Sequence, residues 1–384
     1  MAKKKIFVVL GTRPEAIKLA PVILSARNSG WADAIVCNTG QHREMSSEVL
    51  NMFGIAPDVD LDIMKAGQTL SDVNSSVLTK IAGPLDAMKP DWVVVQGDTT
   101  TTFSAALAAF YQRVPVAHVE AGLRTGNIYS PWPEEMNRRM VSEIASLHFP
   151  PTEDARANLV REGISSAQIA VTGNTGIDAL KILVRRLETD DALRASAEAV
   201  LVSNGVKLDD RPKVLITGHR RESLGKGFEA ICDAIASLAA KHPDHDFIYP
   251  VHPNPSVRET VYRRLRDGSK SNILLIEPLS YLPFVHLMSH CSLILTDSGG
   301  VQEEAPSLGK RVVVLREVTE RMEGLSSGFV KLAGTETDRI VALASDALSG
   351  RWAVPDGGRD IYGDGGASLK ILDFIRRYGT ADDQ

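Results

Sequence analysis

The sequence predicts an α/β protein with two domains, each built on a doubly wound parallel sheet. Short apolar runs typical of buried strands alternate with amphipathic segments typical of helices along almost the whole chain. Strands separated by helices form right-handed βαβ units and therefore parallel sheets. The alternation occurs in two series, and 384 residues is about the length of two domains.

The first series of predicted elements lies in the N-terminal half. Its apolar runs predict strands over Lys5–Leu10, Ala34–Asn38, Trp92–Gln96, Pro115–Val119 and Leu147–Phe149. Between them, helical periodicity predicts helices over Pro14–Ala26 and Thr101–Tyr111. Pro14 fits the first turn of its helix, because the missing N–H and fixed φ of proline are compatible with that position.

The second series repeats this rhythm. It predicts strands over Val214–Thr217, Phe247–Val251, Ile273–Ile276, Leu293–Thr296 and Arg311–Leu315. The intervening helices are expected near Phe228–Ala240, Ser256–Arg266 and Leu282–His290.

The expected break between the domains is a segment rich in turn residues, Val-Thr-Gly-Asn-Thr-Gly at 171–176. We therefore predict an N-terminal Rossmann-like domain over 1–172 and a C-terminal Rossmann-like domain over 173–361. A Gly-rich stretch then precedes an amphipathic helical pattern over Ala367–Tyr378. We expect the C-terminal segment 362–384 to pack back onto the N-terminal domain.

The composition is that of an ordinary soluble globular protein, with 43% hydrophobic and 24% charged residues. A net charge of -5 argues against nucleic acid or an anionic membrane as a partner. The start, Met1 to Leu10, is basic but has too short an apolar run for a secretory signal. No apolar run approaches the roughly 18 residues of a membrane span.

The cysteines and histidines predict neither a disulfide nor a metal site. Cys37, Cys232 and Cys291 lie in or beside apolar segments without CxxC spacing, so buried thiols and a cytoplasmic location are expected. The histidines show no HExxH pattern, and His242 and His245 stand in a polar loop that we expect to be solvated.

The segment from Leu295 to Lys310 is the most informative in the chain. A buried strand ends in Asp297-Ser298, and Gly299-Gly300 then begin a predicted helix whose free N–H groups suit a phosphate. Glu303 and Glu304 follow, where a carboxylate can accept hydrogen bonds from ribose hydroxyls. The alternative is a helix whose acidic residues only complement its dipole, at roughly 0.3–1 kcal/mol each. Pro306 predicts that the helix is short or kinked.

Polar residues follow several predicted strands in the N-terminal half, at the edge where parallel sheets bind ligands. Arg13 stands at a helix start with Lys18 about one turn further, and Arg13 offers a bidentate fork for a phosphate. Asp98, Glu120 and Glu134 supply carboxylates whose crowding would separate their pKa values, as acid and base catalysis require. Surface charge for Arg13 and helix capping for Asp98 remain the alternatives.

In the C-terminal half, His219 and His252 also stand at predicted strand ends, and Arg321 follows the last strand. A histidine there can donate to a phosphate or transfer a proton, although a helix-start residue without a role is the alternative for His219. Together with the Gly-Gly helix, these residues predict a nucleotide-sugar site between the domains.

These segments together resemble one known family, the bacterial non-hydrolysing UDP-N-acetylglucosamine 2-epimerases. The resemblance runs from about residue 5 to 375. The matching motifs are Gly11-Thr-Arg-Pro-Glu-Ala-Ile-Lys18, Gly40-Gln-His-Arg-Glu-Met45, Gln96-Gly-Asp-Thr-Thr-Thr101, His118-Val-Glu-Ala-Gly-Leu-Arg124, Pro131-Trp-Pro-Glu-Glu135, Gly218-His-Arg-Arg-Glu222 and Asp297-Ser-Gly-Gly-Val-Gln-Glu-Glu-Ala-Pro306.

The resemblance implies a fold, an activity and a mechanism. The fold is GT-B, two Rossmann-like domains around an interdomain cleft, in a homodimer. The activity is the interconversion of UDP-GlcNAc and UDP-ManNAc, which supplies ManNAc units for cell-surface polysaccharide, without metal or nicotinamide cofactor. UDP is eliminated to give a 2-acetamidoglucal intermediate, and its re-addition with protonation on the opposite face inverts C2.

The resemblance also assigns residues. The family's catalytic groups correspond to Asp98, Glu120, Glu134 and His219. Its substrate and UDP-binding groups correspond to Arg13, Lys18, Phe284, Ser298, Gly299, Gly300, Glu304 and Arg321. A second UDP-GlcNAc, bound as an activator in many members, would contact Gln41, His42, Gln68 and His252. The chain departs from the usual pattern at Gly67, Gly176 and Met322.

Other functions share parts of this pattern. A 2-epimerase of a related sugar, such as UDP-diacetamido-glucuronic acid, would need an additional basic pocket for a carboxylate. A hydrolysing epimerase would release free ManNAc. A GT-B glycosyltransferase would need an acceptor groove and leave the acidic trio without a purpose. A non-catalytic UDP-sugar sensor would not need the acidic trio or His219.

Overall fold

The protein is described from a computed structural model, which describes residues 2–65, 67–219, 225–266, 271–319, 321–355 and 357–378. The chain divides into two compact units. The first unit comprises 1–179 together with 363–384, and the second comprises 180–362. Each unit is an α/β structure with a parallel sheet, which confirms the predicted fold class.

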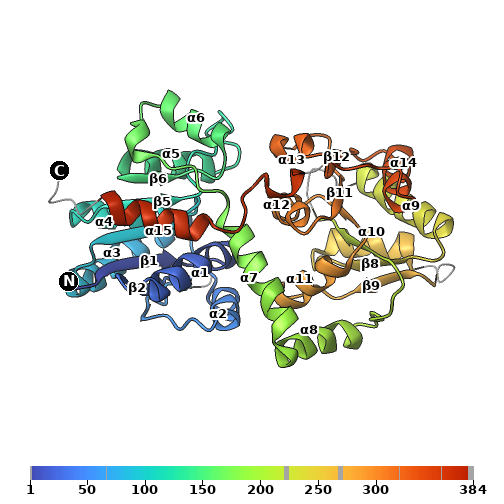
Figure 1. The fold of residues 1–384 in the computed structure, drawn as a ribbon, viewed down its shortest axis with the longest axis horizontal. Helices are drawn as coiled ribbons and strands as arrows, with labels where there is room; N and C mark the ends of the chain where they lie inside the picture. Colours follow the sequence, from blue (N-terminus) through green and yellow to red (C-terminus); the bar gives the residue numbers. More distant parts are fainter. Residues whose placement is uncertain are drawn as a thin grey trace. The chain divides into compact units, whose positions relative to one another are not determined.

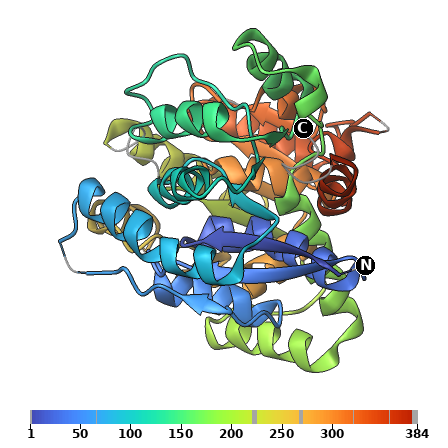
Figure 2. The same ribbon diagram turned by 90° about the vertical axis from the view of Figure 1, so that its left-hand side faces the viewer.

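The first unit has a six-stranded sheet in the order β3-β2-β1-β4-β5-β6. The strands are β1 (Lys4–Leu10), β2 (Ala32–Asn38), β3 (Val59–Asp60), β4 (Trp92–Gln96), β5 (Val116–Val119) and β6 (Leu147–Phe149). The helices are α1 (Arg13–Asn28), α2 (Arg43–Met52), α3 (Leu70–Met88), α4 (Thr100–Tyr111), α5 (Glu134–Ile144), α6 (Glu153–Arg161) and α15 (Ala367–Tyr378). Figures 1 and 2 show this unit, with β1 in dark blue, from two directions.

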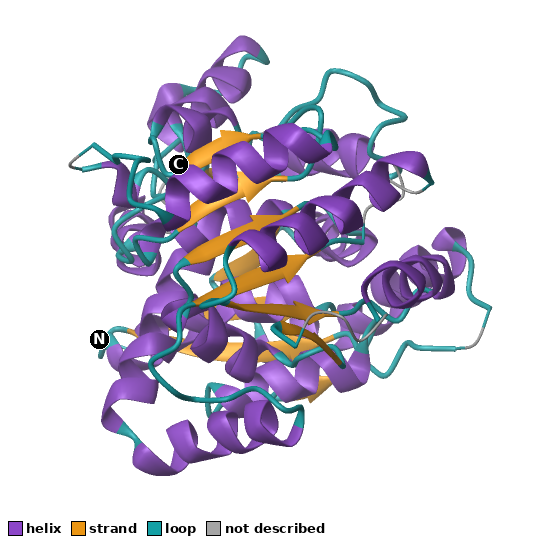
Figure 3. Cartoon of the chain, turned by 90° about the vertical axis from the view of Figure 1, so that its right-hand side faces the viewer, coloured by secondary structure: helices purple, strands orange, loops and turns teal. Residues whose placement is uncertain are grey.

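The second unit has a six-stranded sheet in the order β12-β11-β10-β7-β8-β9. The strands are β7 (Lys213–Thr217), β8 (Asp246–Pro250), β9 (Ile273–Ile276), β10 (Leu293–Thr296), β11 (Arg311–Val314) and β12 (Val330–Leu332). The helices are α8 (Asp191–Ser203), α9 (Lys226–Lys241), α10 (Pro255–Leu265), α11 (Tyr281–His290), α12 (Gly299–Ser307), α13 (Met322–Ser326) and α14 (Thr337–Leu348). Figure 3 shows strands in orange covered by helices in purple. The boundary between the units falls within α7 (Thr175–Thr189).

Both sheets have the strand order of a Rossmann fold, 3-2-1-4-5-6, when each unit's strands are numbered from its own start. The order reverses between β1 and β4 in the first unit and between β7 and β10 in the second. In open α/β sheets, ligands bind beyond the carboxyl ends of the strands at this point. The fold therefore singles out the turns after β1, β4, β7 and β10.

Helices cover both faces of each sheet, and the central strands are largely apolar. Ile6 to Leu10 of β1 and all of β4 and β10 are buried. Buried parallel strands form continuous apolar runs instead of alternating patterns, which is why the sequence predicts them well. The short edge strands β3 and β12 were not predicted.

The C-terminal helix α15 lies in the first unit and packs on α1. Asp178, at the start of α7, accepts hydrogen bonds from the N–H groups of Ala367 and Ser368 at 3.2 and 2.8 Å. The Ser368 hydroxyl also donates to it at 2.8 Å. Since these are the unsatisfied N–H groups of a helix start, Asp178 fixes where α15 begins.

The cysteines are buried, as the sequence predicts. Cys37, Cys232 and Cys291 are free and buried, and burial raises the pKa of each thiol to about 12. No helix among the described residues has the length and hydropathy needed to cross a membrane.

Candidate active site

The residues predicted in the N-terminal half gather at the carboxyl ends of β1, β4 and β5. Arg13 is the first residue of α1, close behind β1, and Asp98 follows β4. β1 and β4 pair directly, so the two turns lie side by side at the point where the strand order reverses. β5 pairs with β4 and is followed by Glu120.

Glu120 is held on both carboxylate oxygens. Lys18 Nζ donates to its Oε1, and Gln96 Nε2 donates to its Oε2. The side chain is only 11% exposed. These contacts bring together Lys18 and Glu120, which the sequence predicts separately, and add Gln96, which it does not.

The backbone at Glu120 has a φ of +62°, in the left-handed region that costs a non-glycine residue about 1–2 kcal/mol. The N–H groups of Glu120 and Ala121 both donate to the carbonyl of Phe149, at 3.0 and 3.3 Å, and hold the chain in this turn. Gly97 is also left-handed, at +72°, and a Cβ on it would lie 3.5 Å from Glu120 Oε2. Such strain is typical of functional positions.

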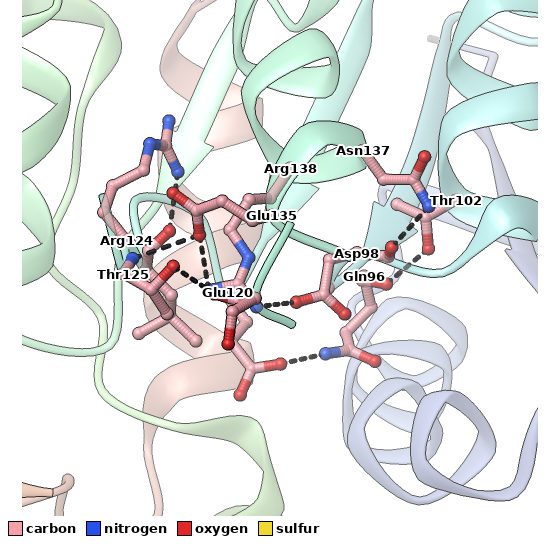
Figure 4. Close-up of polar contacts among 12 residues, drawn as sticks. Gln96, Asp98, Thr102, Glu120, Arg124, Thr125, Glu135, Asn137 and Arg138 are labelled. Carbon is pink, nitrogen blue, oxygen red and sulfur yellow. Dashed lines mark hydrogen bonds and ion pairs between the residues drawn. The ribbon is translucent and has the colours of Figure 1, made fainter. Parts of the chain in front are cut away.

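Asp98 lies close to Glu120 and is held by α5. Arg138 donates to its Oδ2 at 2.5 Å, and Asn137 donates to its backbone carbonyl at 3.0 Å (Figure 4). Burial raises the pKa of the Asp98 carboxyl above its usual range, and Glu120 adds to the rise, while Arg138 opposes it. Asp98 does not cap the next helix, because Thr99 is the residue that accepts the N–H of Thr102.

Glu134 is the first residue of α5 and is half-buried. It stands four residues before Arg138, so both lie on one face of the helix. The neighbouring Glu135 is 1% exposed and accepts hydrogen bonds from the N–H groups of Thr125 and Gly126 at 3.1 and 3.3 Å. Arg138 lies 3.4 Å from Glu135, so one guanidinium serves two carboxylates (Figure 4).

Two buried histidines support this end of the sheet. His118 on β5 donates through Nε2 to the carbonyl of Gly97 at 2.7 Å, and His148 is its register partner on β6. Burial lowers the pKa of His118 to about 3 and that of His148 to about 4.

These histidines predict a loss of stability in mild acid. The unfolded chain takes up protons at both rings near pH 6.5, whereas the folded protein does so only near pH 3–4. The unfolded state binds more protons in between, so the free energy of unfolding falls as the pH drops from about 6.5 to about 4. Urea unfolding at pH 7 and pH 5 measures this loss. We expect His148→Asn to reduce the loss and His42→Asn, at an exposed site, to leave it unchanged. An unchanged loss in His148→Asn would contradict the assignment.

In the second unit, the predicted UDP-binding residues gather around α12. Ser298 precedes its first turn, which Gly299 and Gly300 begin. Arg321 donates to Glu303 at 2.8 Å, and a Cβ on Gly299 would lie 3.2 Å from the Arg321 guanidinium. The helix is only nine residues long, as Pro306 predicts. A cation therefore lies directly against the free N–H groups of a helix start, an arrangement that suits a diphosphate.

Glu304 lies on the same helix and accepts a hydrogen bond from the Tyr281 hydroxyl at 3.0 Å. Tyr281 begins α11, and Phe284 is three residues further on that helix. The structure thus brings Glu304 and the segment carrying Phe284 together. The two acidic candidates differ in their contacts. Glu303 pairs with Arg321, whereas Glu304 faces α11.

His219 follows β7 and is placed by Asp297, which follows β10. The His219 N–H donates to Asp297 Oδ2 at 2.6 Å, and His219 Nδ1 lies 3.3 Å from Oδ1. The ring stacks on His252 with 5.0 Å between centroids. A residue predicted for the activator therefore contacts a residue predicted for catalysis. Arg220, Arg221 and Glu222 of the same motif lie outside the described residues.

The other activator candidates lie in the first unit. Gln41 Oε1 accepts a hydrogen bond from Thr101 at 2.7 Å, and the exposed His42 precedes α2. The Gln68 side-chain amide accepts a hydrogen bond from the Lys65 N–H at 2.9 Å and donates one to the Ile63 carbonyl at 2.8 Å. These bonds stabilise the loop that precedes α3.

Two local expectations need correction. His245 is 8% exposed and therefore buried, not solvated. It forms a group with His242 and Asp244. The ligand atoms of these three residues lie within 4.8 Å of one another, close enough to hold a metal ion. Gly176, the last residue of the segment 171–176 in which we expected turns, lies in the first turn of α7. Met322 begins α13 and is exposed.

The whole chain matches a described protein family. Residues 6–376 match the family described as UDP-N-acetylglucosamine 2-epimerase. The chain belongs to this family. It is 51% identical over 377 residues to the probable UDP-N-acetylglucosamine 2-epimerase of Ralstonia solanacearum, with 98% of this chain and 99% of that protein covered. It is 49% identical over 375 residues to the UDP-N-acetylglucosamine 2-epimerase of Escherichia coli K12, with coverage of 97% and 98%.

A solved epimerase structure confirms the fold. The UDP-GlcNAc 2-epimerase from Neisseria meningitidis, crystallised with UDP-GlcNAc, matches with a TM-score of 0.85 and 45% identity over 97% of this chain and 100% of that chain. The predicted GT-B type of fold and the predicted membership of an epimerase family are therefore confirmed.

Several residues of the candidate site were not assigned from the sequence. Three residues outside the prediction contact predicted site residues, namely Gln96, Arg138 and Asp297, and a fourth, Glu135, pairs with Arg138. A signal existed for Arg138, whose spacing of four from Glu134 places a cation on the carboxylate face of α5. Gln96 is the last residue of β4 and so lies at the predicted edge of the sheet.

Proposed function

We propose that this protein interconverts UDP-GlcNAc and UDP-ManNAc by reversible elimination and re-addition of UDP. The observation that supports this most directly is the pair of carboxylates at the β4 and β5 ends, Asp98 and Glu120, each with its own cation. A chain that belongs to the epimerase family and carries this pair has the groups needed for proton transfer at carbon.

The first unit would act on the sugar. Inversion at C2 needs a proton removed on one face of the ring and returned on the other, so two proton-transfer groups are required. Asp98 suits one of these roles, because Arg138 holds its Oδ2 and burial raises its pKa toward the working range. Glu134, on the Arg138 face of α5, and Glu120 are the partners we propose. Because the reaction is reversible, the base of one direction is the acid of the other.

The second unit would bind UDP. We propose that the N–H groups at the start of α12 and Arg321 bind the diphosphate, that Glu304 binds the ribose, and that Phe284 lies at the uracil. In the first unit, we propose Arg13 as a ligand of the departing phosphate. In the second unit, we propose His219 as a hydrogen-bond donor to phosphate. These cations and donors would stabilise the negative charge that develops on UDP.

The proposed reaction balances in electrons and protons. Removal of the C2 proton supplies the electron pair of a C1–C2 double bond, and the bond from C1 to the UDP oxygen breaks. In the return step that oxygen attacks C1, and C2 takes a proton on the opposite face. Nothing is oxidised or reduced overall, so the balance requires no redox cofactor.

Proton NMR of the purified protein with UDP-GlcNAc in D₂O tests the proposal. We expect UDP-ManNAc to appear with deuterium at C2. Accumulation of free UDP and ManNAc would favour a hydrolysing epimerase. If UDP-GlcNAc remains unchanged, the proposed substrate is wrong, and UDP-diacetamido-glucuronic acid is the next substrate to assay.

Replacement of Glu304 tests the UDP site. We expect Glu304→Ala to weaken UDP binding by about 10- to 100-fold, because hydrogen bonds to a charged group contribute about 1.5–3 kcal/mol. Tyr281→Phe, which removes the hydroxyl that holds Glu304, should give a smaller loss. Calorimetric titration with UDP measures both, with Glu259→Ala, at an exposed position of α10, as the control. Wild-type affinity in Glu304→Ala would contradict the ribose assignment.

We also propose a homodimer, a cytoplasmic location and an activator role for a second UDP-GlcNAc at Gln41, His42, Gln68 and His252. The free buried thiols suit a reducing compartment. The stacking of His252 on His219 offers a direct route by which an activator could affect catalysis.

A further inference from the structure

Glu15 is a buried carboxylate that the proposed reaction leaves without a role. It stands on the first turn of α1 and is 1% exposed. Its Oε2 accepts hydrogen bonds from the N–H groups of Gly11 and Thr12, both at 2.8 Å, and from the Thr12 hydroxyl at 3.0 Å. These contacts fix the turn between β1 and α1, which leads directly into Arg13.

The other oxygen of Glu15 reaches a distant part of the chain. Oε1 accepts a hydrogen bond from the hydroxyl of Thr99, 84 residues away, and lies 3.1 Å from the hydroxyl of Thr102. The Thr102 hydroxyl also lies 2.7 Å from the Gln96 carbonyl. Thr99 directly follows Asp98 and caps α4. One carboxylate therefore ties the turn after β1 to the turn after β4.

Ordinary helix capping does not account for this second set of contacts. In a capping box, a glutamate at the third helical position accepts the N–H of the residue before the helix. Asp72 on α3 shows the local version, accepting the N–H and hydroxyl of Thr69 at 2.9 and 2.7 Å. Glu15 makes the equivalent local contacts and in addition binds the start of another helix.

We propose that Glu15 is a positioning residue that fixes Arg13 and Asp98 relative to each other. The inference rests on the proposed function, in which Arg13 binds the departing phosphate and Asp98 exchanges a proton with the sugar. Arg13 would hold the group that leaves C1, and Asp98 would exchange a proton at the neighbouring C2, so the separation of the two side chains must match the substrate. A misplacement of about 1 Å can cost about 10²-fold in rate.

Variants at Thr99 distinguish the positioning role of the Glu15–Thr99 contact from the capping of α4 by Thr99. Thr99→Val removes the hydroxyl that binds Glu15, and it also removes a helix cap. Thr152→Val removes an equivalent cap on α6, where Thr152 accepts the Ala155 N–H at 3.3 Å, without touching Glu15. We expect Thr99→Val to lower kcat at least about 10-fold with less change in KM, because the groups are misplaced but still present. Thr152→Val should retain wild-type kcat, and Thr99→Ser, which keeps the hydroxyl, should restore it.

A double-mutant cycle completes the test. Glu15→Ala should lower kcat by about 10²-fold, and adding Thr99→Val should lower it little further, because both changes break the same link. The proposal would be overturned if the fold loss of kcat in the double variant equalled the product of the two single losses. Equal kcat in Thr99→Val and Thr152→Val would overturn it as well. If the wild-type protein converts UDP-GlcNAc, such results refute only the role of Glu15. If the wild-type protein does not convert it, the proposed function fails and this role fails with it.

Discussion

Asp98→Asn is expected to lower kcat for epimerisation by at least about 10²-fold, the lower end of the range typical of a general acid–base group. An asparagine amide fills the same space but cannot take up the C2 proton. The carboxylate lies against Arg138 and near Glu120, so the substitution also removes a charge from a balanced cluster. Deuterium uptake at C2, followed by NMR, should fall with kcat.

The same loss is expected for Glu120→Gln, whose carboxylate binds Lys18 and Gln96. Asp154→Asn, an equivalent substitution at an exposed position of α6, is the matched control and should retain wild-type turnover. Turnover near that of the wild type in both Asp98→Asn and Glu120→Gln would remove the basis of the catalytic assignment. A loss in only one would assign proton transfer to that residue.

Arg138→Met is expected to have the largest effect on stability. The guanidinium serves Asp98 and the buried Glu135, so its removal leaves two carboxylates without their cation. Breaking a buried ion pair from one side costs about 3–5 kcal/mol. In a unit of this size, a loss of about 3 kcal/mol lowers the melting temperature by roughly 6–12 °C.

The control for this variant is Arg139→Met, which removes an exposed arginine one position further along α5. Thermal unfolding of the two variants should differ clearly at pH 8. The difference should narrow toward pH 5, because protonation relieves a carboxylate that has lost its cation. Equal melting temperatures at pH 8 would show that Glu135 and Asp98 do not depend on Arg138.

The central strands could be predicted because burial on both faces makes them continuous apolar runs. The predicted Trp92–Gln96 and Leu293–Thr296 coincide with the central strands β4 and β10, and the predicted Leu147–Phe149 and Ile273–Ile276 coincide with the apolar edge strands β6 and β9. The edge strands β3 and β12 consist of Val59-Asp60 and Val330-Lys331-Leu332, and in each a charged residue stands in or directly after a very short apolar run. Their position depends on the neighbouring strands with which they pair.

Much of the site could also be placed, because polar residues after buried strands must meet at one edge of a parallel sheet. The contacts that support these polar residues could not be predicted. Arg138 reaches Asp98 across 40 residues of sequence, and Thr99 reaches Glu15 across 84. Their roles depend on how helices pack, which no local pattern encodes. The capping-box contact of Thr12 and Glu15 is local, whereas the contact of Glu15 with Thr99 depends on how β1 and β4 pair.

The backbone at Glu120 also bears on protein engineering. A left-handed φ of +62° favours glycine, so a search for thermostable variants that scores only backbone conformation would choose glycine there. That choice would relax the chain and remove a carboxylate that binds Lys18. Relief of about 1–2 kcal/mol of backbone strain is smaller than the roughly 3–5 kcal/mol lost when a buried ion pair is broken from one side, so glycine at this position is expected to lower both stability and turnover.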